Sequence, residues 1–306
     1  MEKVRKTIVT HNGRFHADDV FAVAVLSLVL EKQYGVDGVD IQIIRTRDTE
    51  KIQVGDFVVD VGGIHDPSIH RFDHHQEGKA GNRPNGIPYA AFGLVWKEYA
   101  DVITGNIRVS ERIDDEVVMP IDAVDNGVQI IDPKAVVRPY RIDDFINAYV
   151  TSWTEDEKDL DKNFLYVMEI MKGLLQREVR RITDTLFGSE SVQKIYNESD
   201  DKRLLVLDKP YGYSVSMLEI PEALIIVAPE KVMGKWIIKV VRHIPHSFES
   251  KILFPAAWGG KRDAELEAVT GVTGSIFCHV DCWFAAAKTR EAALELANIA
   301  LKEAGV

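Results

Sequence analysis

The chain has 306 residues, of which 46% are hydrophobic and 28% are charged, so disordered and collagen-like classes are excluded. The net charge of −11 excludes a protein that coats nucleic acid nonspecifically, because Lys and Arg supply that affinity. The longest apolar stretch, residues 20–30, is shorter than the roughly 20 residues of a membrane span. Two cysteines, Cys278 and Cys282, are too few for a disulfide framework. We therefore expect a cytoplasmic protein with reduced thiols and no membrane contact.

The first third of the chain alternates strand and helix patterns. We expect strands at residues 6–10, 41–47 and 56–61, and a helix at residues 19–32. That helix contains VFAVAVLSLVL, which is apolar nearly all round, so we expect it to be buried. The order predicts an α/β fold with a mostly parallel sheet and helices on both faces.

The rest of the chain is first helical and then mixed. We expect four helices, the last one long, charged and with an apolar stripe, at residues 89–99, 110–124, 142–150 and 155–187. Three further strands and a final helix follow at residues 204–207, 223–227, 236–241 and 289–303. The pattern predicts two domains, residues 1–190 and a smaller α/β domain at residues 200–306.

Three clusters of His and Asp follow the ends of apolar strands. They are THNGRFHADD at residues 10–19, FVVDVGG at 57–63 and RFDHHQ at 71–76. Open α/β sheets bind ligands at the carboxyl ends of their strands, so we expect the clusters to meet. Imidazole and carboxylate together suit divalent first-row metals, and carboxylates can bridge two ions roughly 3.5–4 Å apart. The clusters predict one polynuclear metal site in a metal-dependent phosphoesterase.

The first cluster offers three candidate ligands. His11 ends the first strand, while His16 and Asp18 flank one alanine and can point toward the same centre in an extended turn. The next residue, Asp19, is expected to cap the following helix. The alternative is that these residues are caps or surface groups, which is less favoured for three of them within nine residues.

In the second cluster, Asp60 stands inside an apolar strand. An unpaired carboxylate costs several kcal/mol to bury, so something cationic must face it. Gly62 and Gly63 allow close approach of the backbone or positive φ beside the site. The alternative to a metal is an ion pair with Arg45 or Arg47.

The third cluster places two imidazoles side by side. Adjacent residues of an extended chain point to opposite sides, so one histidine can bind metal while the other meets the substrate. We assign His74 as a metal ligand and His75 as the catalytic residue, a phosphate contact or proton donor, although the order of the two is open.

A fourth segment, IDAVDNG, supplies the last carboxylate. Asp122 and Asp125 are three residues apart and share one face if they end a helix, for which Gly127 is a plausible stop. We favour Asp125 at the turn and keep Asp122 as its substitute. The alternative is a solvated Asp in an Asn-Gly turn. Three carboxylates against two divalent ions leave a net positive site for a phosphate.

Cations near the end of the chain are candidates for substrate binding. Lys288, Thr289 and Arg290 open the final helix, where free amides and the helix dipole favour an anion. The alternative is a solvated helix start. We add Arg262 and His279 to this substrate-binding set. Two tryptophans could stack on bases but are more often core residues, namely Trp258 and Trp283.

These motifs, in this order, carry a resemblance over nearly the whole chain. THNGRFHADD, DVGG, RFDHHQ, IDAVDNG, SFESK, PAAWGGKRDAELEAVTGV and KTREAAL resemble the Myg-type (melanocyte proliferating gene) family, within the DHH phosphoesterase superfamily. The resemblance implies a DHH-type first domain that holds two divalent ions, usually manganese, with magnesium or another first-row metal as the alternative. The implied ligands are His11, His16, Asp18, Asp60, His74 and Asp125.

The chain differs from many members of the superfamily at one place and from the family at another. His16 stands where many superfamily members have Asp, and Ala285, Ala286 and Ala287 stand where a glycine pair is usual before KTRE. The first difference softens the metal site slightly. The second bears on how closely a nucleotide approaches the backbone, and therefore on substrate choice.

The resulting hypothesis is a two-metal phosphodiester hydrolase, a 3′ to 5′ exonuclease on RNA, in which an activated hydroxide attacks phosphorus. One alternative is a small-molecule phosphoesterase, such as an inorganic pyrophosphatase or a phosphodiesterase for cyclic or short oligonucleotides. Another is a nonenzymatic metal-binding scaffold. The partner is expected to be RNA or a short oligonucleotide, and a homodimer is one of the oligomeric states left open.

Overall fold

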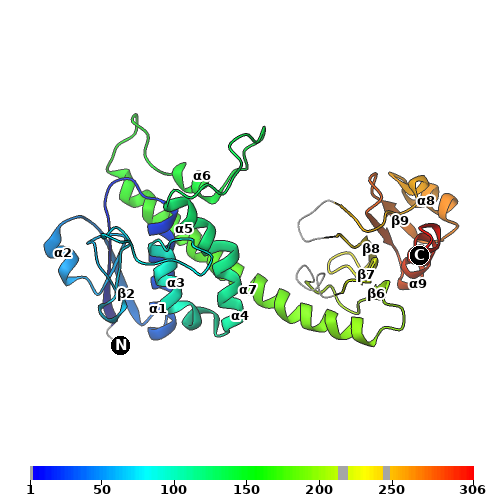
Figure 1. The fold of residues 1–306 in the computed structure, drawn as a ribbon, viewed down its shortest axis with the longest axis horizontal. Coiled ribbons are helices and arrows are strands. Elements are labelled where there is room, and N and C mark those ends of the chain that lie inside the picture. Colours follow the sequence, from blue (N-terminus) through cyan, green and yellow to red (C-terminus); the bar gives the residue numbers. More distant parts are fainter. Residues whose placement is uncertain (1–2, 213–219, 244–248) are drawn as a thin grey trace. The chain divides into compact units, whose positions relative to one another are not determined.

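The chain folds into two compact units in a computed structural model that describes residues 3–212, 220–243 and 249–306 (Figure 1). The first unit ends at Ile182 and the second begins at Thr183, inside the long helix α7 (Asp159–Glu198). Each unit contains a five-stranded sheet with helices, which confirms the predicted two-part α/β fold. The first two residues of the SFESK motif, 247–248, lie outside the described residues.

The sheet of the first unit has the order β2-β1-β3-β5-β4. Strands β2 (Val39–Arg45), β1 (Val4–Thr10), β3 (Phe57–Val59) and β5 (Arg71–Phe72) are parallel, and β4 (His65–Asp66) is antiparallel to β5. The sequence predicted the first three strands. It missed β4 and β5 because two residues are too few to show an alternating pattern.

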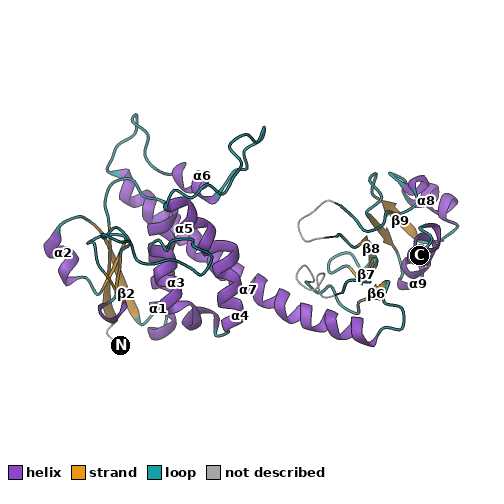
Figure 2. Cartoon of the chain, in the orientation of Figure 1, coloured by secondary structure: helices purple, strands orange, loops and turns teal. Residues whose placement is uncertain are grey.

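Two helices form the core of this unit. Helix α1 (Ala17–Tyr34) is buried from Ala17 to Leu30, as its apolar sequence predicted. Helix α3 (Ala91–Thr104) packs against it, and the rings of Phe21 and Phe92 stack with centroids 5.0 Å apart. The short helix α2 (Thr49–Val54) has no buried residue and lies on the other side of the sheet (Figure 2). This burial fixes the start of α1, where Asp18 lies in the first turn and His16 directly precedes it.

The region expected to be one helix at residues 110–124 is divided. It contains α4 (Ile107–Ile113), a π-helical turn (Asp114–Val118) and α5 (Met119–Asp125). Helix α6 (Ile142–Asn147) and a 3₁₀ turn (Pro67–Ile69) complete the unit together with the first part of α7. The apolar stripe of α7 is buried as predicted, through Phe164, Val167, Met168, Met171 and Leu175.

The sheet of the second unit has the order β6-β7-β8-β10-β9. Strand β6 (Leu204–Val206) is parallel to β7 (Ile225–Pro229), and the pairs among β7, β8 (Trp236–Val240), β10 (Phe284–Ala287) and β9 (Ser275–Cys278) are antiparallel. Helices α8 (Asp263–Thr270) and α9 (Arg290–Glu303) and a 3₁₀ turn (Ala256–Trp258) complete it. The sequence missed α8, β9 and β10.

The core of the second unit settles two expectations. Cys278 and Cys282 are free and buried, and burial raises the pKa of the Cys278 thiol to about 12. Trp258 is 2% exposed and stacks on Phe254, which confirms the favoured expectation that it is a core residue and removes the alternative that it stacks on bases. In the described part of the chain, no helix combines the length and the apolar character that a membrane span requires.

Candidate metal centre

The candidate ligands come together because three neighbouring strands end at one edge of the first sheet. His11 directly follows β1, Asp60 directly follows β3, and His74 stands two residues after β5. The backbone N–H of Asp60 donates to the carbonyl of Phe72 at 3.1 Å, which holds the ends of β3 and β5 in register. The strand-end rule used for the sequence therefore describes the real geometry.

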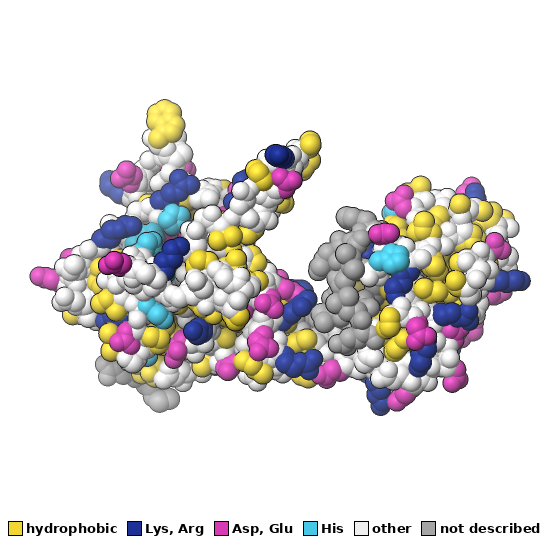
Figure 3. Space-filling model, viewed as in Figure 1, with side chains coloured by type: hydrophobic (Ala, Val, Ile, Leu, Met, Phe, Trp, Pro, Cys, Tyr) yellow, Lys and Arg dark blue, Asp and Glu magenta, His cyan; other side chains and the backbone are white. Residues whose placement is uncertain are grey.

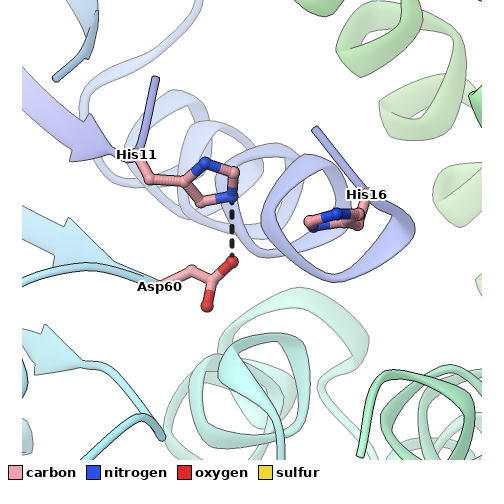
Figure 4. Close-up of side chains that lie close together, drawn as sticks. All are labelled: His11, His16 and Asp60. Carbon is pink, nitrogen blue, oxygen red and sulfur yellow. Dashed lines mark ion pairs between the residues drawn. The ribbon is translucent and has the colours of Figure 1, made fainter. Parts of the chain in front are cut away.

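Three groups of side chains at this edge place their ligand atoms within 4.8 Å of one another. They are His11, His16 and Asp60, then Asp60, His74 and His75, then Asp18, His74 and Asp125. Figure 4 shows the first group, in which His11 and Asp60 point toward each other from two strand ends. The structure thus brings together all six residues that the resemblance implied, and His75 with them.

Asp60 belongs to two of these groups. Its Oδ2 lies 3.3 Å from Nε2 of His11, and its Oδ1 lies 3.3 Å from Nε2 of His74. Its φ of 54° is left-handed, a conformation that costs a non-glycine residue free energy and is concentrated at functional sites. A carboxylate held in this way can be shared by two ions.

The alternative partners for Asp60 are engaged elsewhere. Arg45 forms an ion pair with Asp161 at 2.5 Å, and Arg47 donates to the backbone and side-chain oxygens of Asn12. The alternative to a metal, an ion pair of Asp60 with either arginine, is therefore wrong, and Asp60 faces imidazoles instead.

Several polar atoms at this edge are buried without a hydrogen-bond partner. They include Oδ1 of Asp60, Nε2 of His74 and Oδ2 of Asp19. Such atoms are rare in folded proteins, because an unpaired buried polar group costs about 1–3 kcal/mol. Lone pairs of imidazole and carboxylate that converge in this way fit a divalent metal ion.

Two further carboxylates approach His74 from helices. Asp18 accepts hydrogen bonds from the backbone of Ala91 at 2.9 Å and Phe92 at 2.7 Å, so it also caps the start of α3. Its Oδ2 is 3.8 Å from Nε2 of His74, and Oδ2 of Asp125 is 3.3 Å from the same nitrogen. Asp125 is the last residue of α5, where the chain turns and its carboxylate can reach the strand ends.

Asp122 is placed differently. It is fully buried, pairs with Nη1 of Arg83 at 2.7 Å and accepts from the backbone N–H of Gly93 at 3.0 Å. Arg83 also binds Asp114. Asp122 therefore belongs to an internal ion pair and joins none of the three groups, so it is not a substitute for Asp125. The sequence did not reveal Arg83, because its partners are distant along the chain.

Asp19 is the neighbour that sequence reasoning placed only in part. As predicted, it caps α1, since its Oδ1 accepts from the backbone N–H of His16 at 2.8 Å. Its other oxygen is 3.2 Å from Nε2 of His11. Burial raises the pKa of Asp19 to about 7, despite the attraction of His11.

The charges of the site are unbalanced without a cation. Burial, followed by repulsion from Asp60, raises the pKa values of Asp18 and Asp125. Burial also acts against charge on His11 and His74, but the nearby carboxylate of Asp60 raises the pKa of both imidazoles. The two imidazoles in turn lower the pKa of Asp60 although it is buried. Bound divalent ions would stabilise the ionised carboxylates that protons otherwise neutralise.

These residues line a pocket of about 970 Å³. Its wall also carries the basic residues Arg47, Lys79 and Arg141. Figure 3 shows histidine and basic side chains close together on one face of the first unit. Sequence reasoning considered Arg47 only as a partner for Asp60 and did not single out the other two, because the loops that carry them have no recognisable motif.

Comparison with known proteins is consistent with this geometry. A family model described as an uncharacterised protein family, UPF0160, matches residues 7–301. The chain belongs to this family, the MYG1 exonuclease family. Human MYG1 exonuclease is 30% identical, over 97% of this chain and 86% of its own. The MYG1 protein of Dictyostelium discoideum is 29% identical over 95% of both chains, and that of Saccharomyces cerevisiae is 29% identical over 98% and 96%.

Membership in the MYG1 family confirms the Myg-type resemblance and identifies the chain as an enzyme of the nuclease or phosphoesterase type. The second unit holds the five residues expected to bind substrate. Lys288 and Arg290 are exposed beside Thr289, whose hydroxyl caps α9 by accepting from Ala292 at 3.2 Å. The guanidinium of Arg262 lies 4.4 Å from the ring centroid of Phe277, and Nδ1 of His279 accepts from the backbone of Asp281.

The alanines that replace the glycine pair in this MYG1-family chain form strand β10. Ala285, Ala286 and Ala287 are at most 1% exposed, and the first and last pack in the core that surrounds α9. Their methyl groups therefore fill the interior of the second unit rather than its surface.

Proposed function

We propose that the chain is a two-metal phosphodiester hydrolase that acts as a 3′ to 5′ exonuclease on RNA in the cytoplasm. The observation that carries the proposal is the position of Asp60, whose two oxygens face different histidines of two ligand groups. Two ions that share a carboxylate lie at the separation that suits in-line attack on a phosphodiester. Manganese is the first choice, with magnesium or another first-row metal as the alternative, because the site mixes imidazole nitrogen with carboxylate oxygen.

In this proposal, His11, His16 and Asp60 would hold one ion, and Asp18, His74 and Asp125 would hold the other. When bound, the ions lower the pKa of the attacking water and neutralise charge that develops on the phosphate. The capping bonds of Asp18 fix its carboxylate before any ion binds, which limits the entropy lost on binding.

His75 is the proposed catalytic residue. Its side chain is 61% exposed, and both its backbone N–H and its Nδ1 contact Oδ1 of Asp73, at 3.1 and 2.8 Å. Asp73 is itself held by the backbone N–H of Gly63 at 2.6 Å. This arrangement orients the ring and leaves Nε2 to contact a phosphate oxygen or to protonate the leaving oxygen.

The second domain, residues 200–306, is proposed to bind the nucleic acid. Lys288, Thr289 and Arg290 combine positive charge with the free amides of a helix start, and Arg262 and His279 are further polar contacts. The exonuclease names of the mammalian relatives support a nucleic acid substrate. A pocket near the upper end of the range for small ligands, roughly 300–1,000 Å³, favours an oligonucleotide over pyrophosphate.

The test compares the wild-type chain with His74→Ala, each supplied with Mn²⁺. The substrates are 5′- and 3′-labelled RNA and DNA, dinucleotides and pyrophosphate. We expect the wild type to shorten RNA from its 3′ end and the variant to be inactive. Equal activity of the two proteins would contradict the site. Preferential turnover of pyrophosphate would identify a small-molecule phosphoesterase, and binding of Mn²⁺ without turnover would identify a scaffold.

A further inference from the structure

Two cations on the pocket wall are held in place by neutral groups. Nη1 of Arg47, in the loop after β2, donates to the carbonyl and the side-chain oxygen of Asn12, the latter at 3.0 Å. Nζ of Lys79, in the loop after β5, donates to Oδ1 of Asn126 at 3.2 Å. Within the part of the chain that the structure describes, neither cation has a carboxylate within 4.0 Å. The positive charge of each side chain is therefore not neutralised by an adjacent carboxylate and can attract an anion in the pocket.

The anchors of these cations are residues next to candidate ligands of different groups. Asn12 follows His11, and its carbonyl also lies 3.1 Å from Nδ1 of that histidine. Asn126 follows Asp125, and its Nδ2 donates to the carbonyl of Asp122 at 3.0 Å, which turns its Oδ1 toward Lys79. One cation thus stands beside each end of the metal centre.

The backbone at Lys79 is also specialised. Its φ of 58° is left-handed, and the turn is closed by its N–H, which donates to the carbonyl of Gln76 at 3.0 Å. The side chain of Gln76 donates back to the carbonyl of Lys79 at 3.3 Å. A lysine in a conformation that favours glycine costs free energy, and such residues are concentrated where ligands bind.

We propose that Arg47 and Lys79 form two phosphate subsites, one at each end of the metal centre, that bind non-scissile phosphates of a single-stranded oligonucleotide. The inference rests on the proposed function and adds a substrate class to it. Such a site selects substrates with several consecutive phosphodiesters over an isolated diester or pyrophosphate. The first unit then recognises the backbone charge by itself, without reading the bases.

The experiment measures kcat/KM with Mn²⁺ on two substrates, an RNA pentanucleotide and bis(p-nitrophenyl) phosphate, which has no neighbouring phosphate. In Arg47→Gln and in Lys79→Gln, the fold-loss of kcat/KM should be at least ten times larger on the pentanucleotide than on the single diester. Each should also flatten the dependence of log(kcat/KM) on log salt by about 0.7, the value per phosphate contact on single strands.

Matched controls separate position from net charge. Arg177→Gln and Lys162→Gln remove exposed cations of α7 and should leave both substrates and the salt slope unchanged. Arg47→Lys and Lys79→Arg keep the charge and should restore most of the salt slope. Binding of a phosphorothioate pentanucleotide, followed by fluorescence anisotropy, should weaken in the two glutamine variants as well.

The outcomes distinguish this inference from the proposed function. If the wild type hydrolyses the pentanucleotide and both glutamine variants match the controls, the subsites are refuted while the metal centre stands. Equal losses on both substrates would also refute them, because the cations would then act on the scissile phosphate. If the wild type hydrolyses neither substrate, the proposed function itself fails.

Discussion

The two units of the chain differ in how far their candidate functional residues are buried. In the first unit, His11, Asp60 and His74 follow three adjacent strands, and Nε2 of each histidine lies 3.3 Å from an oxygen of Asp60. In the second unit, the cations expected to bind substrate stand on the surface, and Arg262 covers an aromatic ring. The first arrangement is costly for a fold unless an ion binds, whereas the second costs the fold little.

This difference shows what a sequence motif can specify. A buried carboxylate demands a partner, so its presence after an apolar strand carries information about a site. An exposed lysine or arginine is satisfied by water and carries little information. Variants in the two units should therefore differ in the size and in the kind of their effects.

The largest effect is expected for Asp60→Asn. The amide cannot supply the shared negative charge. Metal ions stabilise the transition state by several kcal/mol, and about 1.4 kcal/mol corresponds to a tenfold change in rate. We expect kcat to fall at least about a thousandfold and the chain to bind less Mn²⁺. Asp37→Asn, an exposed carboxylate in the same unit, is the matched control and should behave as wild type. Retained activity in the Asp60 variant would contradict the site.

Breaking the internal ion pair of Arg83 and Asp122 should lower stability without affecting metal binding. Arg83→Gln leaves the fully buried Asp122 without its partner, which typically costs about 3–5 kcal/mol. We expect urea titrations to show that the free energy of unfolding of the first unit falls by that amount. The amount of Mn²⁺ bound per folded chain should stay the same. A loss of metal with unchanged stability would instead place Asp122 among the ligands.

The dependence of stability on pH follows from the raised pKa values. In the folded, metal-free chain the pKa of Asp19 is about 7, against 3.8 when unfolded, so the folded state holds more protons between these values. Stability of the metal-free chain should therefore fall as pH rises from 5 to 7.5, and the raised pKa values of His11 and His74 act in the same direction. Thermal melts with EDTA should show a falling Tm.

Added Mn²⁺ should reverse this trend, since the ions require deprotonated ligands and bind more tightly at higher pH. The rise in Tm on adding Mn²⁺ should be larger at pH 7.5 than at pH 5.5. A Tm that rises with pH in EDTA would mean that the site does not hold excess negative charge.

The smallest effect is expected in the second unit. Lys288→Gln or Arg290→Gln removes an exposed charge, and such contacts contribute about 0.2–1 kcal/mol. We expect KM for RNA to rise about two- to fivefold with little change in kcat. Lys302→Gln, in the last turn of the same helix, is the control. A loss of kcat as large as that of Asp60→Asn would remove the contrast between the units.

Much of the first unit could be predicted because its long elements have clear periodicity. The strands before His11 and Asp60 and the apolar helix α1 have strong patterns, and strand order alone places their ends together. The sequence could not predict that Asp19 would approach His11 or that Asp122 would pair with Arg83. Both depend on which side of a helix faces a distant residue, and this is set by tertiary packing.

The second unit was predicted less well for a related reason. Strands β9 and β10 have four residues each, and three of those in β10 are alanines, which favour helices over strands. Trp258 illustrates the ambiguity of aromatics, since only the packing against Phe254 shows that it belongs to the core. The pocket cations Arg47 and Lys79 were missed because no local pattern marks a surface cation that lines a cavity.

The central claim is that Asp60 joins two ions in one centre. Electron paramagnetic resonance of the full chain, titrated with Mn²⁺, tests it most directly. We expect two ions per chain at saturation and the spectrum of an exchange-coupled pair roughly 3.5–4 Å apart, which Asp60→Asn should abolish. A single uncoupled ion in the wild type, or a coupled pair that survives in Asp60→Asn, would contradict the claim.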